Sequence, residues 1–483
     1  MAPQELTRAL ARCGLRASDP RLQGLSEALS RRRRPLDQAA FTELVCNRIG
    51  LVDRALSGRL VVPDFPGLEA ELDRIYASAR ARADGTVADY IPQLSRVDPE
   101  QFGVSVCTID GQRYARGEAS RDFCIQSCCK PINYCLALEA HGADEVHRYV
   151  GREPSGHHFN EITLNAEGKP HNPMINAGAI MTCSLIHPDA SRGDRFDAVM
   201  ERWSALAGGG KAGFSNAIYQ SERETADRNF ALAYFMREHG AFPRGIDLVE
   251  VLEFYFQCCS IEQTTDRMAV VAATLAAGGV NPLTGERIFS PNTVKHCLSL
   301  MASCGMYDFS GEFAFRVGLP AKSGVSGALL IVVPNIMGIC TWSPRLDSLG
   351  NSVRGVAFCE GLLESYRFHA FDDLTGSSTK KLDPTRRSDP HEDAVVGMLW
   401  AASRGDLDEV HRLLSSGVEV NAADYDGRTP LLLAAAEGWP MLVRYLLAHG
   451  AKADAVDRWD HTPLEEARRG GHAVVEKLLA EAR

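Results

Sequence analysis

The sequence lacks several patterns that would assign a chain directly to a class of protein. Its 14 cysteines include no C-x-x-C pair and none lies beyond Cys359, so neither a zinc site nor a disulfide framework is indicated. The longest apolar stretch, residues 328–340, is interrupted by Pro334 and Asn335 and is well short of the ~20 residues that a membrane helix needs. We therefore expect reduced thiols and no membrane span.

Clustered positive charge is also scarce. The net charge is −10, and the one dense basic run, Arg31–Arg34, is more typical of a solvated helix end than of an anchor or a targeting signal. Nucleic-acid binding, which clustered lysines and arginines drive, is therefore not expected. The first residues lack the apolar segment of a secretory signal, and Glu5 does not suit a transit peptide. A cytoplasmic location is expected, with the mitochondrial matrix as the alternative.

The length and the residue patterns predict several domains. A chain of 483 residues with 45% hydrophobic and 24% charged residues is long enough for two to four globular domains. Residues 1–62 carry apolar residues at helical spacing and predict an all-α N-terminal module. This module has no D-x-[DN]-x-[DN]-G loop, so calcium binding is not expected. Residues 375–392 are polar and contain prolines, which is typical of a linker, and they separate a central domain, residues 63–374, from residues 393–483.

The C-terminal segment, residues 393–483, contains a sequence repeat. Related segments begin at Ala401, Ala434 and Ala467, and Thr-Pro-Leu recurs at Thr429 and Thr462, all at a period of about 33 residues. This pattern resembles ankyrin repeats. Each such unit buries its apolar face only against a neighbour, so about three units predict a helical stack, and the resemblance suggests a protein partner.

The central domain mixes strand and helix patterns. Residues 103–109 alternate in hydrophobicity, Asp110-Gly111 is a strong hairpin turn, and residues 112–117 can return as the partner strand. Residues 329–333 and 336–342 predict a second hairpin, and the segment between the two hairpins is mainly helical. We therefore expect one β-sheet built from distant segments, with a helical insertion.

A serine and a lysine follow the first hairpin at a spacing that suits covalent catalysis. Ser127 and Lys130 lie one helical turn apart, and Pro131 is tolerated only in a first turn, so Ser127 is expected at a helix N-terminus. There its backbone N–H is free to face a developing oxyanion. A neutral lysine amine can take the proton that makes a serine hydroxyl nucleophilic. The spacing alone is weak, since Ser377 and Lys380 repeat it in the linker.

A second element strengthens this interpretation. Lys322-Ser323-Gly324 stands directly before the second hairpin, and together with Ser127-x-x-Lys130 it resembles the motifs of serine β-lactamases and penicillin-binding proteins. The implied fold is an α/β (α+β) catalytic domain with a helical insertion.

Further segments identify a narrower resemblance, to the serine-dependent glutaminases. They are Tyr90–Leu94, Gln126–Pro131, His171–Ala179, Gln220–Arg223, Asp227–Asn229, Phe254–Phe256, Cys304–Gly311 and Lys322–Val325. With the helical module and the ankyrin-like repeats, the chain is similar to the long, kidney-type and liver-type members. The resemblance implies hydrolysis of the side-chain amide of L-glutamine to L-glutamate and ammonia.

The resemblance also implies the role of each site residue. Ser127 is the expected nucleophile, Lys130 the general base and Tyr307 a proton relay, while the N–H groups of Ser127 and Val325 would form the oxyanion hole. The positions that match those holding the substrate's α-amino and α-carboxylate groups are Tyr90, Asn176, Glu222, Asn229 and Tyr255. Lys322 is the candidate cation that lowers the pKa of Lys130, which must fall by about 2–3 units for a base near neutrality.

Each of these residues also has an ordinary structural interpretation. Asn176 and Asn229 suit turns or caps, Tyr90, Tyr255 and Tyr307 suit half-buried packing positions, and Glu222 suits a solvated helix face. Lys322 suits a surface turn. Only their joint match to the glutaminase motifs favours the catalytic interpretation.

Two other functions stay open from the residues alone, and the remaining expectations follow from the resemblance. The acyl-serine chemistry could act on a β-lactam or a D-Ala-D-Ala peptide, or the chain could be an ankyrin scaffold with an inactive core. His157, His158 and His171 lie in loops without a suggested second shell, so no metal is expected. No cofactor is expected, phosphate is a candidate activator, and the resemblance implies a homodimer or homotetramer.

Overall fold

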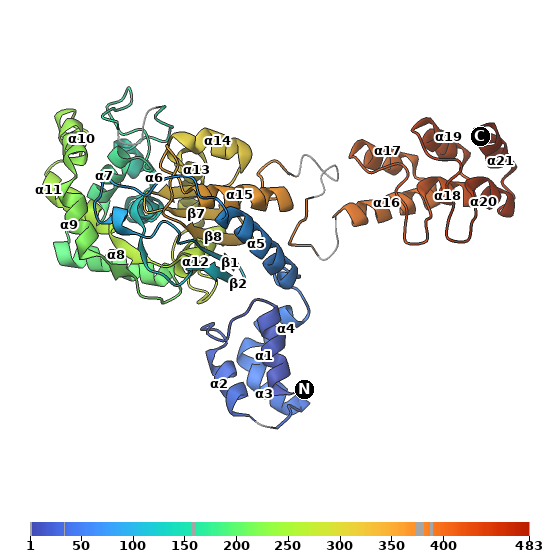
Figure 1. Cartoon of the computed structure of the whole chain (residues 1–483), viewed down its shortest axis with the longest axis horizontal. Coiled ribbons are helices and arrows are strands. Elements are labelled where there is room, and N and C mark those ends of the chain that lie inside the picture. The colour runs from blue at the N-terminus through green and yellow to red at the C-terminus, as the bar shows by residue number, and fades with distance from the viewer. Residues whose placement is uncertain (1, 33, 157–160, 373–380, 387–389, 483) are drawn as a thin grey trace. The chain divides into compact units, whose positions relative to one another are not determined.

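The computed structural model describes residues 2–32, 34–156, 161–372, 381–386 and 390–482. It divides into two compact units, Met1–Glu364 and Ser365–Arg483, each of which is considered by itself (Figure 1). Much of the predicted linker, residues 373–380 and 387–389, lies outside the described residues, so the predicted domain boundaries stay predictions. No helix among the described residues is long and apolar enough to cross a bilayer.

The N-terminal part of the first unit is helical, as predicted. Its elements are α1 (Pro3–Arg12), α2 (Gln23–Arg31), α3 (Gln38–Val45), η1 (Cys46–Arg48) and α4 (Ile49–Leu56). Asp37 caps α3 through the N–H of Ala40. Apolar residues at helical spacing, such as Leu6, Leu10 and Leu25, form a small core of their own. The longer α5 (Phe65–Arg80) leads into the central part of the chain.

A five-stranded antiparallel sheet lies in the central part of the chain. Its strand order is β2-β1-β8-β7-β6, formed by β1 (Gly103–Thr108), β2 (Arg113–Gly117), β6 (Ala321–Gly324), β7 (Ala328–Val333) and β8 (Met337–Trp342). The two predicted hairpins are confirmed, and β1 pairs with β8, with Cys107 opposite Gly338. The expected sheet of distant segments is therefore present.

The helix α12 (Thr265–Ala276) packs on this sheet, and Gly338 shows how closely. A Cβ atom at Gly338 would lie 2.0 Å from the backbone nitrogen of Ala273, so only glycine permits this approach. Figure 1 shows the helices of residues 192–259 on the side of the sheet away from α5. They share one large core with the sheet.

The helical insertion carries the segments that surround the catalytic motif. Besides α12, the helices between the two hairpins are α6 (Lys130–Tyr149), α7 (Asn176–Leu185), α8 (Arg192–Leu206), α9 (Asn216–Glu224), α10 (Asp227–Glu238), α11 (Leu248–Cys259), α13 (Pro291–Cys304) and α14 (Ser310–Arg316). The helix α15 (Val353–Ser365) follows the second hairpin. A second small sheet has the order β3-β5-β4, from β3 (Phe123–Cys124), β4 (Gly213–Phe214) and β5 (Ile261–Gln263). Within α6, Gly142 adopts φ 76° and breaks the helix locally, and helix continues beyond it to Tyr149.

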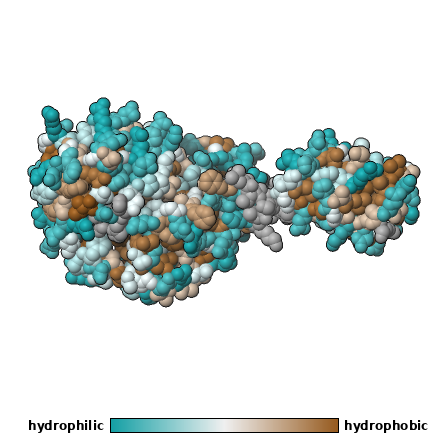
Figure 2. All heavy atoms as spheres, turned by 90° about the horizontal axis from the view of Figure 1, so that it is seen from above, coloured by the Kyte–Doolittle hydropathy of each residue, from teal (hydrophilic) through white to brown (hydrophobic). Residues whose placement is uncertain are grey.

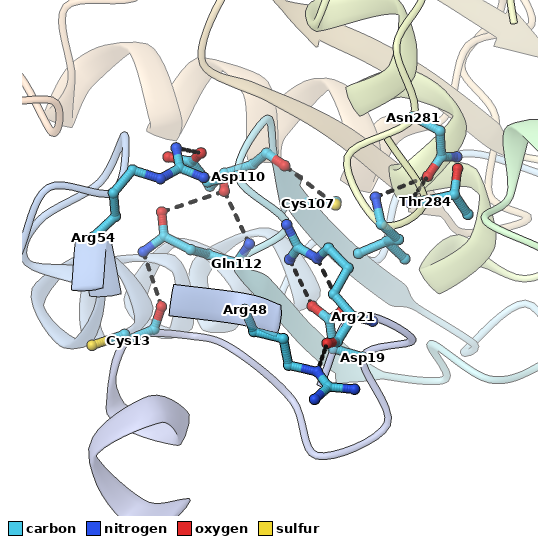
Figure 3. Close-up of polar contacts among 12 residues, drawn as sticks. Cys13, Asp19, Arg21, Arg48, Arg54, Cys107, Asp110, Gln112, Asn281 and Thr284 are labelled. Atoms are coloured by element: carbon cyan, nitrogen blue, oxygen red, sulfur yellow. Dashed lines mark hydrogen bonds and ion pairs between the residues drawn. The ribbon is translucent and has the colours of Figure 1, made fainter. Parts of the chain in front are cut away.

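The turn of the first hairpin is also the attachment point of the N-terminal helices (Figure 3). The buried Gln112 donates from Nε2 to the carbonyls of Cys13 (3.0 Å) and Val62 (2.8 Å). Arg54 pairs with Asp110 at 2.6 Å. One carboxamide therefore satisfies backbone groups from both ends of the helical module.

The second unit is a stack of helix pairs that agrees with the expected ankyrin repeats. The pairs are α16 (Pro390–Arg404) with α17 (Leu407–Ser415), α18 (Pro430–Ala436) with α19 (Pro440–Ala448), and α20 (Pro463–Arg469) with α21 (Ala473–Glu481). Thr429 and Thr462 cap the first helices of their units. Figure 2 shows hydrophobic residues at the surface of this unit, and the large exposed ones include Trp400, Tyr425 and Met441.

Candidate active site

The chain makes a strained turn directly before Ser127. The short strand β3 is held against β5, and the N–H of Ile125 donates to the carbonyl of Ile261 (2.9 Å). Gln126 then adopts φ 47°, which is uncommon for a residue with a side chain and frequent at functional sites. The turn continues as η3 (Gln126–Cys129), and α6 begins at Lys130 with Pro131 in its first turn. The predicted helix N-terminus is therefore present, preceded by a 3₁₀ turn.

Ser127 and Lys130 are both buried at this turn. Ser127 is 8% exposed and Lys130 is 1% exposed, and the Lys130 Nζ donates to Asn176 Oδ1 (2.6 Å). Burial lowers the pKa of Lys130, because the charged amine loses its hydration. The neutral amine, which can accept a proton, is thereby favoured.

Tyr307 reaches the nucleophile from another segment. It opens η4 (Tyr307–Phe309) with φ 55°, a second uncommon backbone conformation for a residue with a side chain. Its hydroxyl donates to the carbonyl of Ser323 (3.1 Å), and its side chain is hydrogen-bonded to that of Ser127. Burial raises the pKa of Tyr307, so its hydroxyl keeps its proton at neutral pH.

Lys322 lies beneath Tyr307 and is fully buried, not a surface residue. Its Nζ donates to the carbonyls of Gly305 (3.1 Å) and Ser323 (2.7 Å) and lies 4.4 Å from the centre of the Tyr307 ring. Burial, followed by the positive charge of Lys130, lowers the pKa of Lys322 to about 7. The pKa of Lys130 itself is lowered by burial, so the role of Lys322 in lowering it stays a prediction.

Two backbone N–H groups are available near the serine hydroxyl. Among the described residues, the N–H groups of Ser127 and Val325 donate to no protein acceptor. Gly324 brings the two segments together: a Cβ atom there would lie 2.8 Å from the carbonyl oxygen of Ile125 and 3.2 Å from Cys128 Sγ. The glycine of the Lys-Ser-Gly motif is therefore required by this close approach.

The predicted amide and tyrosine residues of the substrate set form one connected group with Lys130. Asn176, at the start of α7, accepts from Lys130 and from the Tyr255 hydroxyl (3.3 Å), and its Nδ2 donates to Asn229 Oδ1 (3.1 Å). Tyr255 and Asn229 come from α11 and α10. Three helices of the insertion thus place these side chains beside the base.

Glu222, on α9, is a buried carboxylate at 7% exposure rather than part of a solvated helix face. Burial raises its pKa to about 7, although the Gln126 amide and the charge of Lys130 act in the opposite direction. Gln126 Nε2 donates to Glu222 Oε2 (3.2 Å) and to the carbonyl of Cys259 (3.3 Å). Gln126 is a residue that the sequence interpretation left without a role. Its only local signal was its place directly before Ser127.

Tyr90 lies in a loop at the edge of this group. Its neighbours Ala88, Ile91 and Leu94 pack with Tyr307 and Val325, whereas Tyr90 itself is 53% exposed. The loop thus brings Tyr90 near the site with its ring partly in solvent, where a substrate could cover it.

No metal ligand set is present beside Ser127 in the part of the chain that the structure describes. The one group of carboxylate and imidazole atoms close enough to hold an ion there is Asp457, His461 and Glu466 in the repeats. Glu466 pairs with Arg469 (2.7 Å), and Asp457 accepts from two turn N–H groups, so this group is already partnered. His157 and His158, which were weighed as ligands, lie outside the described residues.

Comparison with known families assigns each part of the chain. The family model "Glutaminase" matches residues 85–371, "Ankyrin repeats (3 copies)" matches residues 398–483, and "EF-hand domain" matches residues 1–63. The EF-hand match agrees with paired helices, but the segment lacks the calcium-loop pattern noted above.

Known proteins give the same assignment. The chain is 45% identical over 485 residues to "Glutaminase liver isoform, mitochondrial" of Rattus norvegicus, covering 99% of this chain and 80% of that protein. It is 44% identical over 321 residues to "Glutaminase" of Nostoc sp., covering 66% of this chain and 95% of that protein.

Solved structures agree on the fold. "Probable glutaminase from Bacillus subtilis complexed with 6-diazo-5-oxo-L-norleucine" matches with a TM-score of 0.56 and 32% identity, over 63% of this chain and 96% of that one. "Crystal Structure Analysis of Mglu" matches with a TM-score of 0.59 and 33% identity, over 72% of this chain and 96% of that one. The buried Ser127, Lys130, Tyr307 and Lys322 thus lie in a domain whose sequence and fold both match, and the chain belongs to the glutaminase family.

Proposed function

We propose that this protein hydrolyses the side-chain amide of L-glutamine to L-glutamate and ammonia through an acyl-enzyme on Ser127. The observation that carries the proposal is the burial of Lys130 one turn from Ser127, because burial lowers the pKa of the amine that would take the serine proton. Membership of the glutaminase family supports L-glutamine as the substrate.

The first half of the reaction forms an ester and releases ammonia. Neutral Lys130 takes the hydroxyl proton of Ser127 as Oγ attacks the carboxamide carbon, and the N–H groups of Ser127 and Val325 stabilise the resulting oxyanion. The C–N bond then breaks, and the leaving nitrogen receives that proton through Lys130 or Tyr307, whose hydroxyl is hydrogen-bonded to Ser127. Ammonia departs and the γ-glutamyl ester of Ser127 remains.

The second half reverses these roles with water. Lys130 removes a proton from water, the hydroxide attacks the ester carbon in the same oxyanion hole, and Ser127 regains its proton as L-glutamate leaves. Glu222 is the partner for the substrate's ammonium group, and Asn176, Asn229, Tyr255 and Tyr90 are the donors for its α-carboxylate. L-Glutamine is a zwitterion, so its site needs one carboxylate that faces the ammonium group and neutral hydrogen-bond donors that face the α-carboxylate.

The Ser127→Ala variant tests the mechanism. Ammonia and glutamate release from L-glutamine should be present in the wild type and lost in folded Ser127→Ala, measured with and without phosphate. No release by folded wild type in either condition would contradict the proposal, and so would full activity of the variant.

Assembly, activation and location are further proposals about the same enzyme. A homodimer or homotetramer and activation by phosphate are proposed from the family resemblance, and sedimentation with and without phosphate tests both. The mitochondrial alternative gains support from the name of the rat relative, and cell fractionation would decide it against a cytoplasmic location.

A further inference from the structure

A chain of hydrogen bonds leads from a buried tryptophan to the expected oxyanion hole. Trp342 Nε1 donates to the carbonyl oxygen of Ser326 (2.9 Å). The same peptide group carries the N–H of Gly327, which donates to the carbonyl of Gly324 (2.9 Å). The peptide group of that carbonyl carries the N–H of Val325. The indole N–H is therefore connected through two peptide groups to the N–H of Val325, the expected oxyanion donor.

This arrangement fixes and polarises the Val325 donor. A carbonyl that accepts a hydrogen bond makes the N–H of its own peptide group a stronger donor, so linked peptide groups strengthen one another in a buried site. This turn requires glycine at position 327, because Gly327 adopts φ 91° and a Cβ atom there would lie 2.0 Å from the carbonyl oxygen of Ser343. The orientation of the Val325 N–H thus depends on the bond that Trp342 makes.

The ring of Trp342 contacts the other side of the site. It stacks on Phe123, with ring centres 5.1 Å apart and an angle of 7° between the planes. Phe123 belongs to β3, the strand that leads into the turn with Ser127, the second oxyanion donor. Trp342 itself is 2% exposed and lies on β8. One rigid side chain therefore touches the segments that carry both donors.

A second buried tryptophan shows that the fold does not require this hydrogen bond merely to bury an indole. Trp203, on α8, is fully buried, and its Nε1 has no partner among the described residues. The indole N–H of Trp342, in contrast, is directed at the one turn that presents Val325.

We propose that Trp342 is a positioning residue of this enzyme, which orients and polarises the Val325 N–H through the Ser326–Gly327 and Gly324–Val325 peptide groups. The inference rests on the proposed function, since it concerns the transition state of that reaction. Because the oxyanion forms only during the reaction, Trp342 acts on kcat and leaves the binding of substrate and product unchanged.

The test replaces the indole N–H while keeping an aromatic ring. Removing a direct oxyanion donor lowers kcat by about 10²–10³-fold, so a weakened donor should lower it by about 10-fold in Trp342→Phe. KM for L-glutamine and the inhibition constant of L-glutamate should stay within about twofold. Trp203→Phe is the matched control, with the same change at a buried indole outside the site, and its kcat should equal that of the wild type.

A second variant separates the N–H from the size of the ring. Incorporation of 3-benzothienylalanine at position 342 exchanges the N–H for sulfur in a ring of nearly the same shape, and it should reproduce the loss in kcat if Trp342→Phe does not fold. A kcat within twofold of the wild type in this folded variant would overturn the inference, as would a loss that appears only in KM or equally in Trp203→Phe. The two failures can be told apart. If the proposed function were wrong, the wild type itself would release no ammonia from L-glutamine.

Discussion

At the residue scale, burial gives the site its acid–base properties. Lys130, Lys322 and Glu222 are all ionisable groups with little access to water, and each pKa moves toward neutrality because the charged form loses hydration. The pKa values of Lys322 and Glu222 are both about 7, so the protonation of these two groups changes near neutral pH. The pH dependence of the enzyme therefore reports directly on these residues.

Glu222 gives a specific expectation for the acid side of the pH profile. Its pKa in the free enzyme is about 7, and only the ionised carboxylate pairs with the substrate's ammonium. As the pH falls below about 7 the carboxylate becomes protonated, so kcat/KM for L-glutamine should fall, approaching tenfold per pH unit for this one group. Glu222→Gln should lower kcat/KM by about 10- to 100-fold at pH 8 and make the fall on the acid side less steep, because only the protonation of Lys130 then remains, as measured in steady-state assays from pH 5.5 to 9.

The control is the same change on an exposed carboxylate of the same helix. Glu224→Gln should keep both the rate and the limb, because Glu224 lies in solvent. If Glu222→Gln kept an unchanged acid limb, the assignment of that limb to Glu222 would be wrong.

At the element scale, the sequence predicted those hairpins and helices that are marked by a turn motif or by a repeated capping motif. Asp110-Gly111 predicted the first hairpin, and the Thr-Pro-Leu period predicted the repeat helices that Thr429 and Thr462 cap. The strained turn at Gln126 and the positive φ of Tyr307 have no such signal, because long-range packing imposes both conformations. The pairing of β3 with β5 was missed for the same reason, since these strands are too short to show a pattern.

The same distinction holds for the site residues: those in sequence motifs were predicted, whereas contacts made by long-range packing were not. The motifs around Ser127 and Lys322 were sufficient to propose both residues, and the structure places Tyr307 between them. The hydrogen bonds of Gln126 and Trp342 could not be predicted, because their partners come from segments far away in the sequence. Nothing in the residues beside them indicates those partners.

The repeats carry a side-chain contact at the same position of successive units. Trp439 Nε1 donates to the carbonyl of Ser403 (2.9 Å), and one repeat later His472 Nε2 contacts the carbonyl of Ala436 (3.0 Å). Each residue is the N-cap of the second helix of its own unit, and its side chain contacts the preceding unit. The stability of such a stack depends on these neighbour contacts.

Trp439→Ala should therefore weaken the contact between the first two units. It removes a hydrogen bond and the packing of a half-buried ring, which together contribute about 1–2 kcal/mol. Hydrogen exchange of α17 and α18 amides should become faster by the corresponding factor. Trp400→Ala is the control, because that ring is 66% exposed and should change exchange little. Equal effects of the two substitutions would refute a role for the Trp439 contact.

At the scale of the whole chain, the helical module is tied to the catalytic part through a few buried groups. Gln112 bonds to backbone groups of Cys13 and Val62, and Asp266 pairs with Arg16 of the module (2.9 Å). Asp266 lies in the first turn of α12, the helix that packs on the sheet. The Nostoc relative aligns over 95% of its own length with only 66% of this chain, so a family member exists without room for all three parts.

Gln112→Ala should loosen the helical module without stopping turnover. The change leaves the Cys13 and Val62 carbonyls buried without their donor, and each unsatisfied group costs about 1–3 kcal/mol. Limited proteolysis should then cut faster between residues 57 and 64, while kcat stays within about twofold. Gln38→Ala, a glutamine exposed on α3, should leave the cleavage rate unchanged. An unaltered cleavage rate in Gln112→Ala would exclude this attachment role.

The pairing of β1 with β8 also has a consequence for the synthesis of the protein on the ribosome. Cys107 leaves the exit tunnel long before its partner Gly338 is made, and at 5–20 residues per second the interval is roughly 10 to 50 s. During that time the β1–β2 hairpin presents an open edge, and the insertion helices have no completed sheet to cover. The yield of active enzyme in a foreign host should therefore depend on translation speed and chaperone supply across this interval more than on the stability of the finished fold.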